Sequence, residues 1–150
     1  MVQKMVQKFD IALQAKINDF KKRFNINNIK EEDIFEEFSN YTIMSNEAQK
    51  EIENINSVST NKAEGIDGIG IFINNRLITE ESDLDKIGEN EKLNIKLCFV
   101  QSTTNNNFDG KKFKAYIDKV IDFLVEEFNI EPFSTIYKKL LDEESDYIDN

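Results

Sequence analysis

The sequence contains no histidine, and this absence excludes several kinds of chemistry. Without histidine the chain by itself cannot build a Ser-His-Asp or Cys-His catalytic site, or a zinc site with histidine ligands. The single cysteine, Cys98, lies in an apolar run and is expected to be a small buried hydrophobic residue, so an internal disulfide and a cysteine-based metal cluster are excluded as well. Any metal ion would need oxygen ligands, which suit magnesium, manganese or calcium.

Long apolar runs and positive charge are also scarce. No stretch approaches the roughly 18 consecutive apolar residues of a membrane span, and the start MVQKMVQKFD lacks the apolar core of a secretory signal. We therefore expect a soluble, cytoplasmic protein without a membrane partner. The net charge of −10 opposes unaided binding to nucleic acid, unless bound cations, another domain or a subunit supply the positive charge.

The apolar residues that are present suffice for one core. Twelve phenylalanines and a hydrophobic content of 39% in 150 residues predict a single domain over residues 1–150. Apolar spacings of three and four predict an amphipathic helix over about residues 3–24 and a second helix that runs to about residue 45. Two alternative capping boxes can open the second helix: Asn28 with Glu31, or Asp33 with Glu36.

An acidic residue and three glycines interrupt a strongly β-forming run between residues 64 and 78. With a period of two, Asp67 falls on the same face as Ile69, Ile71 and Ile73. A carboxylate among apolar side chains is costly unless it is paired, hydrogen-bonded or bound to a metal. The pair Asn74-Asn75 tolerates positive φ, and it predicts a hairpin that returns the chain through residues 76–78.

A later strand over residues 93–100 becomes apolar on both faces towards its end. By parity, Gln101 and Thr103 leave this strand on the side of Phe99. The remaining periodic segments predict a short helix capped by Ser82 and ended by Gly88, a helix over residues 113–128 and a last helix after Pro132. Together these elements indicate an α/β (α+β) fold with a small sheet flanked by helices.

Three separated segments resemble, in the same order, the amino-terminal domain of the AIPR (abortive infection phage resistance) family. They are Phe35-Glu36-x-Phe38-x-Asn40-Tyr41, then Gly65-Ile66-Asp67-Gly68-Ile69, then Phe99-Val100-Gln101-Ser102 followed by Phe108-Asp109. The match covers roughly residues 33 to 112, and that domain is in turn similar to the restriction-endonuclease-like nuclease superfamily. The resemblance implies a restriction-endonuclease-like core with a small mixed β-sheet, at the amino terminus of a longer antiphage protein.

The chemistry implied by the resemblance is metal-assisted hydrolysis of nucleic-acid phosphodiester bonds, with Mg²⁺ or Mn²⁺ as cofactor. Asp67 would be the principal metal ligand, Gln101 the second, and Glu36 the helix acid that completes the set. DNA or RNA would be bound through the full-length protein, and a homo-oligomer is a further expectation. Thr103 stands where related nucleases have a lysine, whose loss would cost roughly 10²- to 10³-fold in rate if it resembles loss of another preorganised donor.

Alternatives remain at each position. Three explanations are open for Thr103. The domain could be a weak or inactive nuclease, Lys111 or Lys112 could replace the missing lysine, or position 103 could carry an engineered substitution. Asp67 can instead be satisfied by backbone amides at a strand bend. Glu36 can be a capping partner or a solvated acid, with Glu37 the inward residue, and Gln101 can simply end a strand.

Two other functions compete with the enzymatic one. An inactive module for protein interaction or oligomerisation would keep the nuclease fold without its chemistry, and the acidic composition and Thr103 favour it. An inhibitor-like protein that mimics nucleic-acid charge would instead group its carboxylates on one face.

Overall fold

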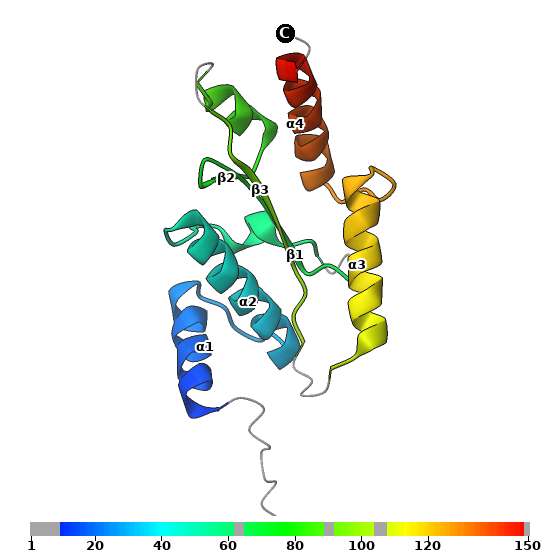
Figure 1. Ribbon diagram of the computed structural model, residues 1–150. Coiled ribbons are helices and arrows are strands. Elements are labelled where there is room, and N and C mark those ends of the chain that lie inside the picture. Colours follow the sequence, from blue (N-terminus) through cyan, green and yellow to red (C-terminus); the bar gives the residue numbers. More distant parts are fainter. Residues whose placement is uncertain (1–9, 62–64, 89–91, 104–107, 149–150) are drawn as a thin grey trace, which may run out of the picture.

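The computed structural model combines helices with a small antiparallel sheet (Figure 1), and it describes residues 10–61, 65–88, 92–103 and 108–148. Within these residues the elements are, in chain order, α1 (Ile11–Arg23), α2 (Glu31–Ala48), η1 (Ile55–Val58), β1 (Gly68–Ile73), β2 (Arg76–Ile78), η2 (Glu81–Lys86), β3 (Ile95–Val100), α3 (Gly110–Leu124) and α4 (Phe133–Ile148), where η marks a 3₁₀ helix. None of the described helices is both long and apolar enough to cross a membrane.

The sheet has the order β2-β1-β3, and both pairings are antiparallel. Asn74 and Asn75 adopt φ of 51° and 67°, which confirms the predicted hairpin between β1 and β2. The α+β class is confirmed, but the predicted mixed sheet is wrong for the described strands. The described chain makes no parallel pairing because the hairpin turns at once and β3 returns along the other edge of β1. The restriction-endonuclease-like core stays a prediction.

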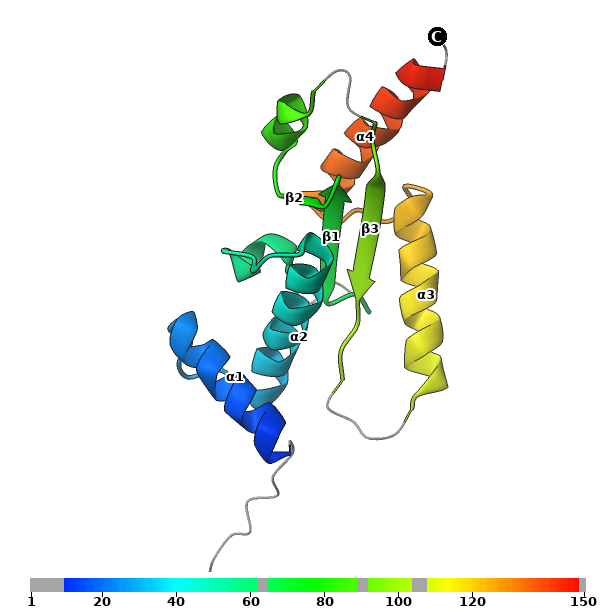
Figure 2. The same cartoon turned by 60° about the vertical axis from the view of Figure 1, so that its left-hand side comes forward.

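Helices cover both faces of the sheet. Gly68, Gly70 and Phe72 face α2, where the side chains of Asn40 and Met44 lie over the two glycines. The alternate residues of β1 join the main core with residues of α3 and α4: Ile69, Ile71, Ile73, Phe123, Phe133, Ile136 and Leu140. Figure 1 shows α2 on one side of the strands and α3 and α4 on the other, and Figure 2 shows the strands between α2 and α3. The two faces predicted from the period of two are therefore confirmed.

The second predicted helix is confirmed, but its predicted start is wrong. Lys30 is the N-cap of α2 and makes no side-chain cap, so neither predicted capping box forms. Three acidic residues in the first turn favour this end through the helix dipole instead: Glu31, Glu32 and Asp33. The cap of η2 is also one that the sequence did not predict, because Glu80 and Asp83 form a reciprocal capping box in place of Ser82.

The first predicted helix is found as α1, which begins at Ile11; the earlier part of the prediction lies outside the described residues. α1 packs on the side of α2 that faces away from the sheet, through Ile17, Phe20 and Ile34. This position makes α1 a support for α2, which in turn holds the start of β1.

Candidate functional site

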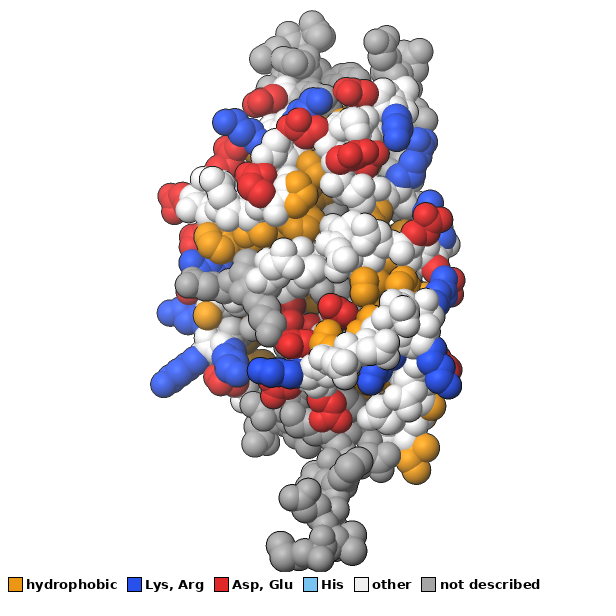
Figure 3. Space-filling view, turned by 180° about the vertical axis from the view of Figure 1, so that it is seen from behind, with side chains coloured by type: hydrophobic (Ala, Val, Ile, Leu, Met, Phe, Trp, Pro, Cys, Tyr) orange, Lys and Arg blue, Asp and Glu red, His pale blue; other side chains and the backbone are white. Residues whose placement is uncertain are grey.

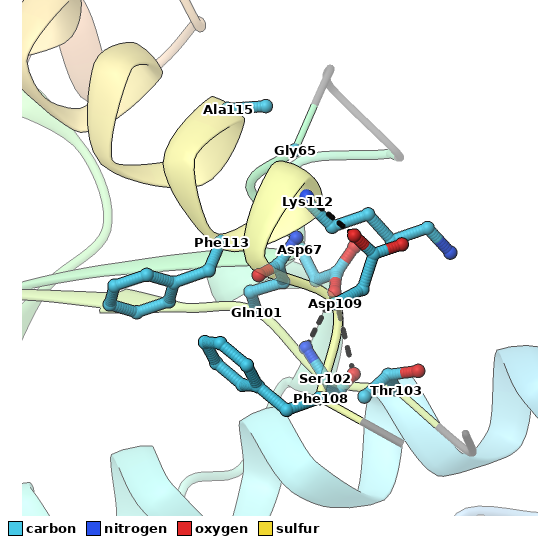
Figure 4. Close-up of a pocket in the computed structure, with 10 residues that line it drawn as sticks. All are labelled: Gly65, Asp67, Gln101, Ser102, Thr103, Phe108, Asp109, Lys112, Phe113 and Ala115. Carbon is cyan, nitrogen blue, oxygen red and sulfur yellow. Dashed lines mark hydrogen bonds between the residues drawn. The ribbon is translucent and has the colours of Figure 1, made fainter. Parts of the chain in front are cut away.

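A pocket of about 510 Å³ opens where β1 begins and β3 ends, beside the amino-terminal half of α3. The described residues that line it are Gly65, Asp67, Gln101, Ser102, Thr103, Phe108, Asp109, Lys112, Phe113 and Ala115 (Figure 4). Three of the four predicted site residues are therefore brought together, although up to 36 positions separate them in the sequence. Glu36 is not among the lining residues, and it lies half-buried on α2.

The register of the sheet explains why Asp67 and Gln101 meet. Gly68 pairs with Val100, so the residue before β1 and the residue after β3 emerge at the same end of the sheet. The backbone N–H of Asp67 donates to the carbonyl oxygen of Val100 at 2.8 Å, which extends the pairing to the edge of the pocket. Two neighbouring antiparallel strands thus deliver a carboxylate and an amide to one place.

The carboxylate of Asp67 accepts hydrogen bonds from Ser102. The backbone N–H of Ser102 lies 2.8 Å from Oδ2 of Asp67, and the Ser102 hydroxyl lies 3.4 Å from the same oxygen. The alternative in which backbone amides satisfy this acid therefore has direct support. Because Ser102 contacts Oδ2, its two donors also fix the orientation of the carboxylate relative to the strand ends.

The pKa of the nearby Tyr116 phenol is shifted by its surroundings. Its hydroxyl donates to the carbonyl oxygen of Phe99 at 2.8 Å. Burial raises the pKa of the Tyr116 phenol, and the negative charges of Cys98 and Asp67, when ionised, raise it further. The phenol therefore remains a hydrogen-bond donor at neutral pH, and it holds α3 against the outer edge of β3.

Asn40 of α2 holds the backbone of Asp67 from the other face of the sheet. Only 3% of Asn40 is exposed, and its Nδ2 donates to the carbonyl oxygen of Asp67 at 3.1 Å. A Cβ atom on Gly68 would lie 2.3 Å from Oδ1 of Asn40, so glycine is what lets α2 approach so closely. Among the described groups, this buried Oδ1 has no hydrogen-bond partner.

Thr60 ties down the chain just before β1. Its hydroxyl donates to the carbonyl oxygen of Ile66, and its backbone N–H donates to the carbonyl oxygen of Asp67 at 3.4 Å. The turn that carries Asp67 is therefore held from two directions, by Thr60 and by Asn40. Such support keeps the carboxylate in one position at the edge of the pocket.

The start of α3 adds a second carboxylate. Asp109 is the N-cap, and its Oδ1 accepts from the backbone N–H groups of Lys111 and Lys112 at 3.0 and 3.3 Å. Lys112 lines the pocket and Lys111 does not. Figure 4 shows the Lys112 side chain running alongside Asp109. Of the two lysines considered as substitutes at position 103, only Lys112 therefore lines the pocket.

The pocket offers oxygen ligands for a hard cation, but too few to complete its coordination shell, so water molecules would supply the rest. Asp67, Gln101 and Asp109 offer carboxylate and amide oxygens, which are ligands that Mg²⁺ and Mn²⁺ accept. Across the described part of the chain, no group of three or more His, Cys, Asp or Glu side chains is arranged to hold a metal ion. Figure 3 shows acidic side chains gathered in a hollow near the middle of one face, with basic side chains at its edge.

Four contributors were not predicted as parts of the site: Ser102, Asp109, Asn40 and Thr60. Asp109 directly precedes an apolar helical stripe, which is a recognisable N-cap signal. Ser102 follows Gln101, but parity directs its side chain away from the predicted pair, so only its backbone amide had a reason to be considered. Asn40 stands in a segment that carries the resemblance, but no role was predicted for it, because that role depends on how α2 packs against β1.

Comparisons of the chain with models of known protein families, with curated proteins and with solved structures found no match. The geometry of the pocket is therefore the evidence on function, and the resemblance to the AIPR family stays an expectation.

Proposed function

We propose that this chain is a nuclease-like domain of an antiphage defence protein, and that its pocket supports metal-dependent hydrolysis of nucleic-acid phosphodiester bonds. One observation carries the proposal: Asp67, Gln101 and Thr103, three of the four residues predicted as a set, line a single pocket. An open pocket at the ends of strands, supported by buried Asn40 and Thr60, also suits a site that must stay rigid.

Each residue has a distinct role in this proposal. Asp67 and the amide oxygen of Gln101 would hold Mg²⁺ or Mn²⁺, which when bound supplies charge stabilisation and an activated water. Ser102 would orient the Asp67 carboxylate through its 2.8 Å hydrogen bond. Asp109 is placed to assist from the start of α3, whereas Glu36 is half-buried and is not a lining residue.

Thr103 limits the expected rate. Its hydroxyl is neutral and short, so it cannot stabilise the charge that develops on phosphate as a lysine ammonium would. Lys112 supplies the one lysine side chain among the described lining residues. We therefore expect weak cleavage that a lysine at position 103 strengthens.

A cleavage assay with added metal tests the proposal. The protein is incubated with single- and double-stranded DNA and RNA in Mg²⁺ or Mn²⁺, beside the variants Thr103→Lys and Asp67→Asn. We expect slow cleavage by the unmodified chain, a rate about 10²- to 10³-fold higher for Thr103→Lys, and none for Asp67→Asn. If neither the unmodified chain nor Thr103→Lys cleaves any substrate while both remain folded, the proposed activity is wrong.

A second candidate function is an interaction module with the same fold and no chemistry. The hydrogen bonds from Ser102 favour it, because they give the Asp67 carboxylate a structural reason to be where it is. In this case Asp67→Asn would leave every functional readout unchanged, since the amide oxygen still accepts from Ser102.

A further inference from the structure

Helix α3 exposes apolar side chains along one face. Four residues at helical spacing are between 36% and 57% exposed: Ile117, Ile121, Leu124 and Val125. The buried face of the helix uses other positions, chiefly Tyr116 and Phe123, which contact Phe99 of β3. Figures 1 and 2 both show α3 at the outer edge of the molecule. Such a continuous row differs from the apolar residues that are scattered singly over normal surfaces.

The charges of α3 run against its own dipole. Lysines occupy the first turns at positions 111, 112 and 114, and the last turn and the residues after it carry Asp122, Glu126 and Glu127. Apart from the N-cap Asp109, this order is unfavourable, since helices favour acids at the start and bases at the end. Among the other helices, α1 ends with basic residues and α2 begins with acidic ones, whereas α4 has neither acids in its first turn nor bases in its last.

Packing against an antiparallel copy of the same helix would place these charges beside charges of opposite sign. With helices of opposite direction, the basic start of each copy lies beside the acidic end of the other, and a twofold axis repeats the match at both ends. Lys111, Lys114, Asp118 and Asp122 lie along one flank of the apolar row by helical spacing. Neither lysine makes an ion pair with any described residue. Charge and apolar surface therefore favour the same partner.

We propose that the exposed face of α3, here called the α3 face and defined by Ile117, Ile121, Leu124 and Val125, is a dimer interface for a second copy of this chain. The two α3 helices pack antiparallel, crossing near Ile117 and Ile121. The apolar row is then removed from water, and lysines of each copy lie near Asp118 and Asp122 of the other.

Sedimentation velocity with charge-reversed variants tests this interface. The chain is run at concentrations up to about 200 µM, a range that detects weak dimers, at an ionic strength of about 0.15 M, which screens the repulsion between acidic molecules. Variant one carries Lys111→Glu and Lys114→Glu, and variant two carries Asp118→Lys and Asp122→Lys. Each alone should self-associate roughly tenfold more weakly than the unmodified chain. An equimolar mixture should recover association, because each like-charged flank then meets its opposite.

A neutral change separates the apolar contribution from the charges. Ile121→Ser should abolish the dimer, whereas Ile11→Ser, at an α1 residue that is 78% exposed and outside the α3 face, should leave it intact. Circular dichroism checks that every variant is folded. A monomeric unmodified chain at the highest concentration would overturn the proposal, and so would a mixture that fails to associate. If Lys111 and Lys114 bind nucleic acid and the chain does not self-associate, these lysines serve a different partner. That result would also overturn the proposed dimer.

Discussion

At the scale of single residues, Asp67 carries both the structural and the functional interpretation. Its carboxylate accepts from Ser102, and its carbonyl oxygen accepts from Asn40 and Thr60. The structural role needs an acceptor oxygen, whereas the functional role needs a negative charge. Substitutions that separate the oxygen from the charge can therefore separate the two roles.

Two substitutions at Asp67 make this separation. Asp67→Ala leaves the Ser102 amide without its partner, and it should lower the free energy of unfolding by about 1 to 3 kcal/mol. Asp67→Asn keeps an acceptor oxygen, so its unfolding free energy should change by less than about 1 kcal/mol. Urea denaturation measures both. Equal losses of stability in the two variants would show that the charge, and not the hydrogen bond, holds this turn.

Gly68 tests the contact between α2 and the sheet. In Gly68→Ala the new Cβ would lie 2.3 Å from Oδ1 of Asn40, which is almost fully buried and has little room to move. The free energy of unfolding should fall by about 1 to 3 kcal/mol. Gly110→Ala is the matched control, because its Cβ would come no closer than 3.8 Å to Phe108. Thermal or urea unfolding should show no loss for the control, and a loss of similar size in both would contradict the packing described for Asn40.

At the scale of elements, the sequence predicted what depends on local pattern. The period of two in β1 and the Asn74-Asn75 turn were sufficient to predict the hairpin and the two faces of its first strand. Parity also predicted that Gln101 and Thr103 share a side, and both line the pocket. Strand direction and helix caps failed because tertiary packing and competition between neighbouring polar residues decide them.

The capping box of η2 makes the stability of the fold depend on pH. Hydrogen bonds from the backbone N–H of Thr79 lower the pKa of Asp83, partly opposed by burial, and the N–H of Glu80 lowers it further. A lowered pKa means that Asp83 stabilises the fold above its unfolded pKa of about 3.9, and that this contribution is lost as the pH falls through the folded value. Asp83→Asn should therefore lower stability at pH 7 by up to about 1 kcal/mol, with the difference shrinking below pH 4.

Urea denaturation of the chain and of Asp83→Asn at pH 7 and at pH 4 and below checks this prediction. Glu81→Gln is the control within the same element, since Glu81 makes none of the Asp83 contacts. A difference between Asp83→Asn and the unmodified chain that stays constant or grows as the pH falls would contradict the assigned role.

At the scale of the whole molecule, the packing of the helices determines which further residues reach the pocket, and the sequence alone did not predict this packing. Asp67, Gln101 and Thr103 could be grouped from the sequence because two strands carry them. Asn40 and Asp109 stand in segments that carry the resemblance but were given no role, since the docking of α2 and α3 brings them to the site. Glu36 was placed in the set by resemblance, and α2 instead brings Asn40, one turn later, to the backbone of Asp67.

Overall charge sets a requirement for any experiment with cations. With a net charge of −10, the surface will attract divalent ions at many places. Binding alone is therefore uninformative, and only binding at a defined position tests the proposed site. A paramagnetic ion meets this need, because it broadens the NMR signals of nearby nuclei most strongly.

The most direct test of the proposed site is a Mn²⁺ titration followed by NMR, with the unmodified chain and Asp67→Asn compared. We predict that the backbone signals of Asp67, Gln101 and Ser102 broaden first and that Mg²⁺ competes with the effect. In Asp67→Asn these signals should persist while the general surface effect remains. Broadening that is spread over the acidic surface, and that is the same in both proteins, would contradict a cation site at Asp67.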